Sequence, residues 1–308
     1  MNSLISKISE LMLMEKSDLL DFSLSAPHRY KKYYIAKRNN AGLRLIAQPS
    51  KQTKFIQRAV LHELKKILPV HHAAMAYEKG TSIKLNAMHH QANRYLLKMD
   101  FKDFFPSITP GIFAQSLQRY NIEFSEEDIL FLQRLLFWRP KRKDTLRLSI
   151  GAPTSPFISN FVMLTFDEAI SQHCIECEIN YTRYADDLTF TSNKKNVLFE
   201  VPEYVSKVLK AHYRNAFSIN EEKTVFSSKA FNRHVTGIVI TNENKLSLGR
   251  EKKRIISSMI HRFSQGKTDE EFAQKLKGLI AFSIYIEPDF IIRMKKKYSD
   301  EVVDIIML

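Results

Sequence analysis

The chain has 308 residues, 44% of them hydrophobic, so it can bury a sizeable core and has the length of about two domains. Lysine and arginine outnumber aspartate and glutamate by 47 to 33, and the net charge of +14 favours a polyanionic partner such as nucleic acid. The N-terminus lacks the pattern of a signal peptide, and the longest apolar stretch is about half of what a membrane helix needs, so we expect a cytoplasmic protein with no membrane partner.

Along the chain, the hydrophobic pattern predicts helices and strands in no regular alternation. Helical periodicity covers Phe55–Leu68, and Ser125 with Asp128 forms a candidate capping box before the apolar run 129–137. Two hairpins are predicted, one with strands 181–184 and 188–191 around an Ala-Asp-Asp turn, the other with strands 235–240 and 246–248. This irregular order predicts an α+β fold and not a doubly wound parallel sheet.

The two cysteines, Cys174 and Cys177, have the C-x-x-C spacing of zinc and redox sites, with His173 in front. A structural zinc site needs four ligands, and the sequence has no second cysteine pair. The flanking residues predict a helix on which the two thiols share a face. We therefore favour a helix without metal over a zinc site.

Three aspartates carry the strongest chemical signal. Asp186 and Asp187 lie between predicted strands that are at least half buried, and Asp100 ends the apolar run 96–100. An acidic pair in a turn has a plain alternative explanation, since aspartate is common in turns. Acids at two strand ends, however, can share two Mg²⁺ ions that activate a hydroxyl and stabilise the leaving oxygen of a phosphoryl transfer.

The segment Tyr184-Ala-Asp-Asp187, with Asp100 upstream, resembles the palm of reverse transcriptases. Further blocks keep the family's order: Arg44–Pro49 in the fingers, Gly151–Pro156 with Asn160 in the template grip, and Lys223 after the palm acids. Two motifs resemble the retron branch in particular, namely Asn86-Ala-Met-His-His90 and Val235-Thr-Gly237. The resemblance spans about residues 40–290 and favours a retron enzyme over intron-encoded and phage-defence relatives.

The resemblance implies a right-hand polymerase with an antiparallel palm sheet. We expect an N-terminal helical segment and fingers in residues 1–95, a palm with fingers insertions in 96–244, and a thumb in 245–308. It also implies two Mg²⁺ ions, or Mn²⁺, held by Asp100, Asp186, Asp187 and the carbonyl of Phe101.

The same resemblance implies roles around the incoming deoxynucleotide. Phe105 would stack under the sugar and exclude a 2′-hydroxyl, unless it is a core phenylalanine. Lys223 would give a proton to the departing pyrophosphate and Arg44 would hold the triphosphate, unless both are ordinary exposed residues.

The backbone at Gly151 and Ala152 would approach the nucleotide or template. Ile150 stands where relatives commonly have a glutamine, so a side-chain hydrogen bond is missing there. This difference puts in doubt a contact from residue 150 to the nucleotide sugar.

A basic helix, 249–263, is predicted near the C-terminus, with Ile255, Ile256, Met259 and Phe263 facing inward. Its first turn is basic, which the helix dipole does not favour, so these side chains are placed to meet phosphates unless they form a merely solvated face. The residues expected to contact nucleic acid are Asn86, His90, Val235, Thr236, Gly237, Arg250, Lys252, Lys253 and Arg254. His89 and His90 are less suited to metal binding than to a structural or RNA-contacting role.

By resemblance, the chain would copy a structured noncoding RNA into DNA, starting from a 2′-hydroxyl of that RNA. The product would be branched RNA–DNA (msDNA), and a separate effector protein would act with it in antiphage defence. Two alternatives stay open: an RNA-binding scaffold that holds RNA and an effector, and an intron-type or abortive-infection reverse transcriptase. The intact acids favour the enzyme.

Overall fold

The computed structural model describes residues 3–37, 42–266 and 268–307. Its centre is an antiparallel sheet in which β3 (Tyr95–Lys102) pairs with β5 (Asp187–Ser192) on one side and with β6 (Ser218–Ile219) and β7 (Val225–Ser228) on the other. Strand β4 (Asn180–Tyr184) pairs with β5 at the edge. The predicted hairpin around the Ala-Asp-Asp turn and the antiparallel α+β character are confirmed.

The two faces of strand β3 differ in character along its length. Leu97, Met99 and Phe101 pack in the main hydrophobic cluster. Leu96, on the other face, belongs to a second cluster. Because side chains alternate along a strand, Asp100 shares the face of Leu96 and not that of the main core.

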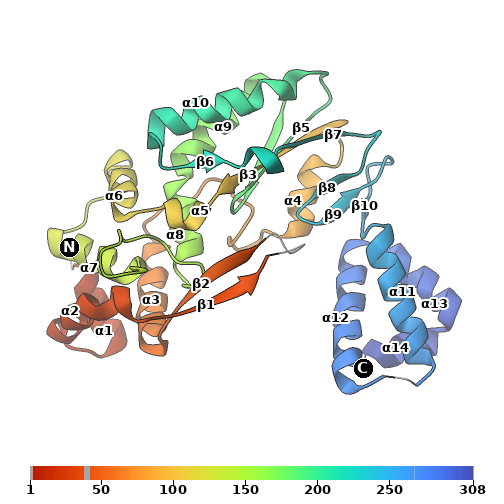
Figure 1. Cartoon of the computed structure of the whole chain (residues 1–308), viewed down its shortest axis with the longest axis horizontal. Helices are drawn as coiled ribbons and strands as arrows, with labels where there is room; N and C mark the ends of the chain where they lie inside the picture. Colours follow the sequence, from red (N-terminus) through yellow and green to blue (C-terminus); the bar gives the residue numbers. More distant parts are fainter. Residues whose placement is uncertain (1–2, 38–41, 267, 308) are drawn as a thin grey trace.

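Helices cover the main-cluster face of the sheet. Figure 1 shows α9 (Leu164–Glu176) and α10 (Val201–Tyr213) above the strands and α8 (Ser155–Val162) beside them. The predicted helix around the two cysteines is thus α9. Short elements complete this part: α5 (Phe104–Ser107), η3 (Val197–Phe199) and η4 (Glu221–Lys223).

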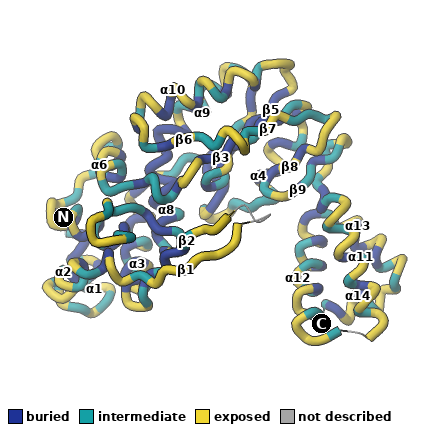
Figure 2. The backbone as a smooth tube through the Cα atoms, in the orientation of Figure 1, coloured by how far each residue is buried: buried dark blue, intermediate teal, exposed yellow. Residues whose placement is uncertain are grey.

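The end of the molecule that carries the N-terminus contains a group of helices and a hairpin, contributed by residues before and after β3 (Figure 1). The helices are α1 (Leu4–Met12), α2 (Lys16–Ser25), η1 (Ala26–His28), α3 (Lys51–Leu64), α6 (Pro110–Arg119) and α7 (Glu126–Leu136). The hairpin pairs β1 (Tyr30–Ala36) with β2 (Leu43–Pro49), and Figure 2 shows most of β1 as exposed. The helix expected over 55–68 starts four residues earlier because Ser50 caps its first turn.

The expected capping box at α7 is half present. The Ser125 hydroxyl accepts the Asp128 N–H, as predicted. The buried Asp128 carboxylate does not accept the backbone N–H of Ser125. It accepts the N–H groups of Leu4 and Ile5 instead, at 3.1 and 2.9 Å. One side chain therefore caps the first turn of α1 and fixes it against α7.

A second sheet lies between the central sheet and the C-terminal helices (Figure 1). It contains β8 (Arg233–Val235), β9 (Ile238–Ile240) and β10 (Leu246–Ser247), and it lies against α4 (Ile83–His90). The predicted single strand 235–240 was wrong. Thr236 and Gly237 have φ angles of 47° and 80°, so a two-residue turn divides it into β8 and β9. The predicted pairing of its second half with β10 is confirmed.

Four helices form the C-terminal body: α11 (Arg250–Ser264), α12 (Glu270–Ile286), α13 (Pro288–Tyr298) and α14 (Asp300–Met307). Their core belongs to the second cluster, in which Ile256 and Ile260 are fully buried. Ile255 was predicted to face inward, but it is 50% exposed, since the buried stripe of α11 follows 256, 260 and 263. No helix in the described ranges combines the length and apolar character that crossing a bilayer requires.

Candidate active site

The three predicted aspartates meet at one end of the central sheet. Asp100 lies directly opposite Asp187 in the β3–β5 pair. The turn between β4 and β5 is Ala185-Asp186, with Ala185 in the left-handed region at φ 57°. The Phe101 N–H donates to the Asp186 carbonyl at 3.0 Å, which fastens the hairpin tip to the end of β3.

Lys223 reaches the same place from η4. Its Nζ lies 2.8 Å from Asp100 Oδ1, although the lysine side chain is 58% exposed. The hydrogen bond to Asp100 raises the pKa of Lys223, which therefore stays protonated at neutral pH. The Asn220 N–H also donates to the Asp100 carbonyl at 2.7 Å, so the backbone before Lys223 is held against β3.

The carboxylates carry negative charge that the protein only partly neutralises. Desolvation and the nearby Asp100 raise the pKa of Asp186, while Arg44 and Lys223 oppose that shift. Desolvation and the charges of Asp186 and Asp100 raise the pKa of Asp187 to about 7. Because the residue as a whole is exposed, we attribute this shift chiefly to the crowding of like charges.

This donor set fits a hard divalent cation, which prefers oxygen ligands and relieves repulsion between carboxylates. Within the described ranges, no three acidic, histidine or cysteine side chains are already gathered as a ready metal cluster. Asp100 is bonded to Lys223 instead.

Residues expected around the nucleotide lie at different distances from the acids. Arg44 is exposed on β2 and acts electrostatically on Asp186. Phe105 is half buried in α5, with its ring centroid 5.4 Å from that of Phe104, and it packs against the main core. Tyr77 was not predicted from the sequence; it has a φ of 67°, and burial and the charge of Asp186 raise its pKa.

Gly151 brings the turn before α8 against β2. It has a φ of 130°, and a Cβ there would lie 2.9 Å from the carbonyl oxygen of Ala47 in β2. The Ala47 N–H donates to the Ile150 carbonyl at 2.9 Å, and Ala152 is buried. The turn thus makes a close backbone approach to β2, which requires glycine. The approach of Gly151 and Ala152 to the nucleotide or template stays a prediction.

A buried ion pair beneath the acidic turn was missed. Arg183 donates to both oxygens of Asp167, with Nη2–Oδ2 at 2.6 Å and Nε–Oδ1 at 2.9 Å, and both side chains are fully buried. The Arg183 Nη1 also donates to Asn160 Oδ1 and to the Ala185 carbonyl, each at 3.1 Å. The left-handed residue of the turn is therefore held by a buried guanidinium.

The same network reaches the loop before α4. The Asn160 amide donates to the Ala76 carbonyl at 2.8 Å, and the Met75 N–H donates to the Arg183 carbonyl at 2.7 Å. The loop that carries Tyr77 is thus anchored to β4. An arginine inside a predicted buried strand was the one sequence signal, since such a residue needs a buried partner.

Asn86 and His90, predicted to contact nucleic acid, are both fully buried. His90 lies 2.7 Å from the Thr182 hydroxyl and 2.8 Å from the Thr191 hydroxyl, and Thr182 donates to the Asn86 carbonyl oxygen at 2.6 Å. These bonds join α4 to the hairpin of Asp186 and Asp187. Both side chains are buried by these contacts, which favours the structural role that was the alternative for His90. A contact of either residue with nucleic acid stays a prediction.

The second retron-like motif lies against the first. Val235 is buried in the second cluster with Ala87, and the Thr236 hydroxyl donates to the Ile83 carbonyl at 3.3 Å. The buried Val235 side chain cannot contact a strand directly, whereas Gly237 is exposed at the turn. Both motifs therefore belong to one junction between α4 and β8–β9.

A further missed pair lies beside that junction. Lys98 Nζ is 2.6 Å from His234 Nε2. Burial lowers the pKa of Lys98, although the negative charge of Asp187 acts to raise it. The Lys98 amino group therefore lies on the same face of β3 as Asp100.

The basic residues of α11 separate into two kinds. Lys253 forms an ion pair with Glu287 at 2.7 Å, and Lys252 lies 4.9 Å from the centroid of the Phe282 ring. Arg250 and Arg254 are exposed. The predicted contact with phosphates therefore suits the two arginines, while the two lysines are engaged within the C-terminal body.

The two cysteines lie at the C-terminal end of α9. Cys174 is buried in α9, and Cys177, the C-cap of that helix, has its Sγ 3.7 Å from His173 Nε2. The His173 ring stacks on Tyr204, with centroids 3.8 Å apart. These contacts agree with the predicted helix.

The sequence matches known reverse transcriptases. Residues 35–259 match the family model "Reverse transcriptase (RNA-dependent DNA polymerase)". The chain is 47% identical to the retron Ec83 reverse transcriptase of Escherichia coli over 288 residues, which cover 93% of this chain and 92% of that protein. It is 34% identical to the retron Ec73 reverse transcriptase of Escherichia coli, covering 91% of this chain and 90% of the relative.

Solved structures share the fold at low sequence identity. A telomerase from Candida tropicalis, solved with a fragment of telomeric RNA, aligns with a TM-score of 0.51 and 12% identity. The alignment covers 92% of this chain but only 59% of that one. At this identity the likeness shows the right-hand polymerase fold and nothing about substrates.

Proposed function

Because this chain belongs to the reverse transcriptases, in their retron branch, and is an RNA-directed DNA polymerase, we propose that it copies part of a structured noncoding RNA into branched RNA–DNA (msDNA). The observation that carries the proposal is the register that sets Asp100 opposite Asp187, with Asp186 in the turn between β4 and β5. Three carboxylates at one sheet end, two of them with raised pKa, are suited to metal-dependent phosphoryl transfer.

In the proposed mechanism, Asp100, Asp186, Asp187 and the Phe101 carbonyl would hold the cations, Mg²⁺ or Mn²⁺. Two such ions supply activation of the attacking hydroxyl and neutralisation of the leaving oxygen. Lys223 stays protonated while it is bonded to Asp100, and on moving toward the triphosphate it gives its proton to the pyrophosphate.

Other residues select and orient the nucleotide. Arg44, exposed on β2 and close enough to act on Asp186, holds the triphosphate. Phe105, fixed by its edge contact with Phe104, limits space beside the 2′ carbon. The backbone at Gly151 and Ala152 keeps β2 at a set distance from the palm.

We further propose fingers in residues 1–95, a palm in 96–244 and a thumb in 245–308. Arg250 and Arg254 contact duplex phosphates, together with the exposed backbone at Thr236 and Gly237. Synthesis starts from a 2′-hydroxyl in the cognate RNA, and a separate effector protein shares a role in antiphage defence.

The test uses Asp186→Asn, which keeps the shape of the side chain but removes its charge. Extension of a primed RNA template should vanish, while Asp103→Asn, an exposed acid three residues after Asp100, should extend normally. Near-normal extension by Asp186→Asn would remove the proposed mechanism. Sequencing of copurified nucleic acid tests the product, because a 2′,5′ branch is diagnostic. If the Asp186→Asn protein still protects cells from phage, the RNA-scaffold function replaces DNA synthesis as the cellular role.

A further inference from the structure

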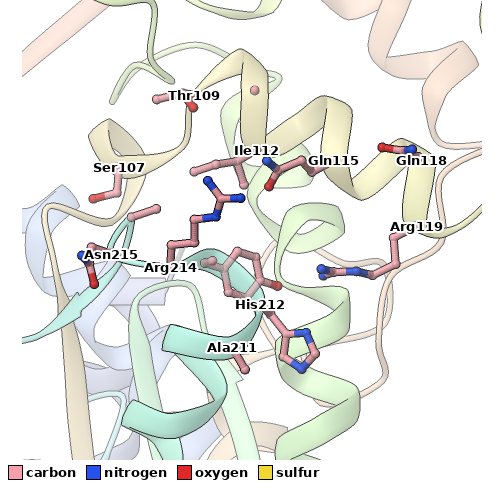
Figure 3. A pocket seen from close by; sticks show the side chains of 13 residues that line it. Ser107, Thr109, Ile112, Gln115, Gln118, Arg119, Ala211, His212, Arg214 and Asn215 are labelled. Carbon is pink, nitrogen blue, oxygen red and sulfur yellow. The ribbon is translucent and has the colours of Figure 1, made fainter.

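A pocket with several polar and basic side chains is distinct from the site of the three carboxylates, none of which lines it. It has a volume of about 760 Å³ and opens between α6 and the C-terminal end of α10. Its basic side chains are Arg119, His212 and Arg214, and none of the described residues that line it is acidic. In Figure 3 the Arg214 side chain extends from the end of α10 toward α6, while Arg119 reaches in from the end of α6.

The two arginines have no carboxylate partner among the described residues. Elsewhere in the same ranges, basic side chains such as Lys223 and Arg293 form ion pairs with acids. A guanidinium at a helix end also interacts favourably with that helix's carbonyls, and this is the plain alternative for Arg119. Helix-end carbonyls do not explain why two guanidinium groups enter one cavity together.

Arg214 occupies a backbone position that normally takes glycine. Its φ and ψ are 55° and −113°, and the Ala216 N–H donates to the Tyr213 carbonyl at 3.0 Å. These values define a type II′ turn with Arg214 at the first central position, where glycine is strongly preferred. An arginine is therefore retained here at a cost in folding stability, which is the pattern expected of a residue kept for its side chain.

Polar groups complete the lining. The amides of Gln115, Gln118 and Asn215 and the hydroxyls of Ser107 and Thr109 surround the arginines. A second cavity of about 630 Å³ shares Arg214 and Asn215 and continues to Glu221 and Thr224, on either side of Lys223. The pocket thus adjoins the turn that carries Lys223.

We infer that this pocket binds phosphate groups, in addition to the phosphate contacts of the active site. Paired guanidinium groups with amide and hydroxyl neighbours match phosphate oxygens in geometry and charge. The volume and the basic lining suit a free nucleoside triphosphate or pyrophosphate, the compounds that this polymerase consumes and releases. A phosphodiester strand is the other source of the same chemistry.

The test measures binding without catalysis, so it does not depend on the proposed metal mechanism. Titrations of dATP and of inorganic pyrophosphate are made by calorimetry in EDTA, where the active-site carboxylates repel both probes. Arg119→Gln/Arg214→Gln should weaken binding by at least about tenfold, since each arginine gives charge-assisted hydrogen bonds. Arg119→Lys/Arg214→Lys should retain most of the affinity. The matched control, Lys7→Gln/Lys195→Gln, removes two exposed charges outside the pocket and should bind as the parent does.

Arg214→Gly separates binding from folding. Glycine relieves the turn, so the melting temperature should rise while phosphate binding falls. Salt titration of a DNA oligonucleotide tests the other source. If nucleotide binding is unchanged but the salt slope of the glutamine pair decreases, the pocket holds strand phosphates. If the glutamine pair binds dATP, pyrophosphate and the oligonucleotide as the parent does, with the same salt slope, the inference is overturned.

Discussion

Replacing Asp167 with asparagine tests whether the buried ion pair positions the acidic turn. The Asp167 carboxylate accepts from Arg183 through both oxygens and from the Tyr181 hydroxyl at 2.7 Å, with no solvent access. Breaking one partner of a buried pair costs about 3–5 kcal/mol, because the other charge stays buried without compensation. We expect a loss of unfolding free energy in that range, measured by urea denaturation.

The double variant Asp167→Asn/Arg183→Met separates stability from positioning. Removing both charges should restore much of the stability, since no lone charge stays buried. The Ala185 carbonyl still loses its donor, so the turn should be less ordered. We therefore expect kcat in primer extension to fall at least about tenfold, with KM for the nucleotide changed little. If the double variant regains stability and full kcat, or if Asp167→Asn costs less than about 1 kcal/mol, the reasoning fails.

Other perturbations test separate parts of the molecule. Burial lowers the pKa of His90 to about 3, below its unfolded value of about 6.5, so its contribution to stability is complete above pH 6.5 and is lost as pH falls. The stability advantage of the parent over His90→Gln should shrink by about 2 kcal/mol between pH 6.5 and 5, and an unchanged difference in urea titrations would refute this. Asp128→Ala should cost about 2–4 kcal/mol, because two buried N–H groups at the start of α1 lose their acceptor, while Asp128→Asn should cost less in the same assay. Phe105→Val should raise the ratio of ribonucleotide to deoxynucleotide kcat/KM, and a constant ratio in an active variant would mark Phe105 as a core residue. Arg250→Gln with Arg254→Gln should lower the salt slope of RNA binding by about 0.7–0.9 per lost phosphate contact, whereas an unchanged slope would identify a solvated face.

The sequence predicted features that depend on local pattern. The Ala-Asp-Asp hairpin was predictable because alternating strands flank a turn, and its pairing with β3 confirms that Asp100 shares the same sheet end. The helix α7 was predictable from its cap at Ser125. In each case, the residues that decide the structure lie within a few positions of one another.

Features that depend on distant partners were not predictable. Asp128 looked like a local cap, but its carboxylate serves Leu4 and Ile5, more than a hundred residues away. For His90 the sequence left a structural or RNA-contacting role open, and only the fold shows that two threonines of the hairpin bond its ring. Periodicity alone also predicted wrongly that Ile255 of α11 is buried. The neighbouring helices decide which apolar residues of α11 are covered.

The second hydrophobic cluster has a consequence for exchanging parts between relatives. It contains Ala87 of α4, Leu96 of β3 and Val235 of β8 as well as Ile256 and Ile280 of the C-terminal helices. A cut at residue 245 would therefore divide one core, leaving apolar side chains uncovered on both fragments. Chimaeras that replace the C-terminal helices should fold cooperatively only if the donor also supplies matching residues at 87, 96 and 235. The unit that can be transplanted is thus defined by packing and not by a continuous stretch of chain.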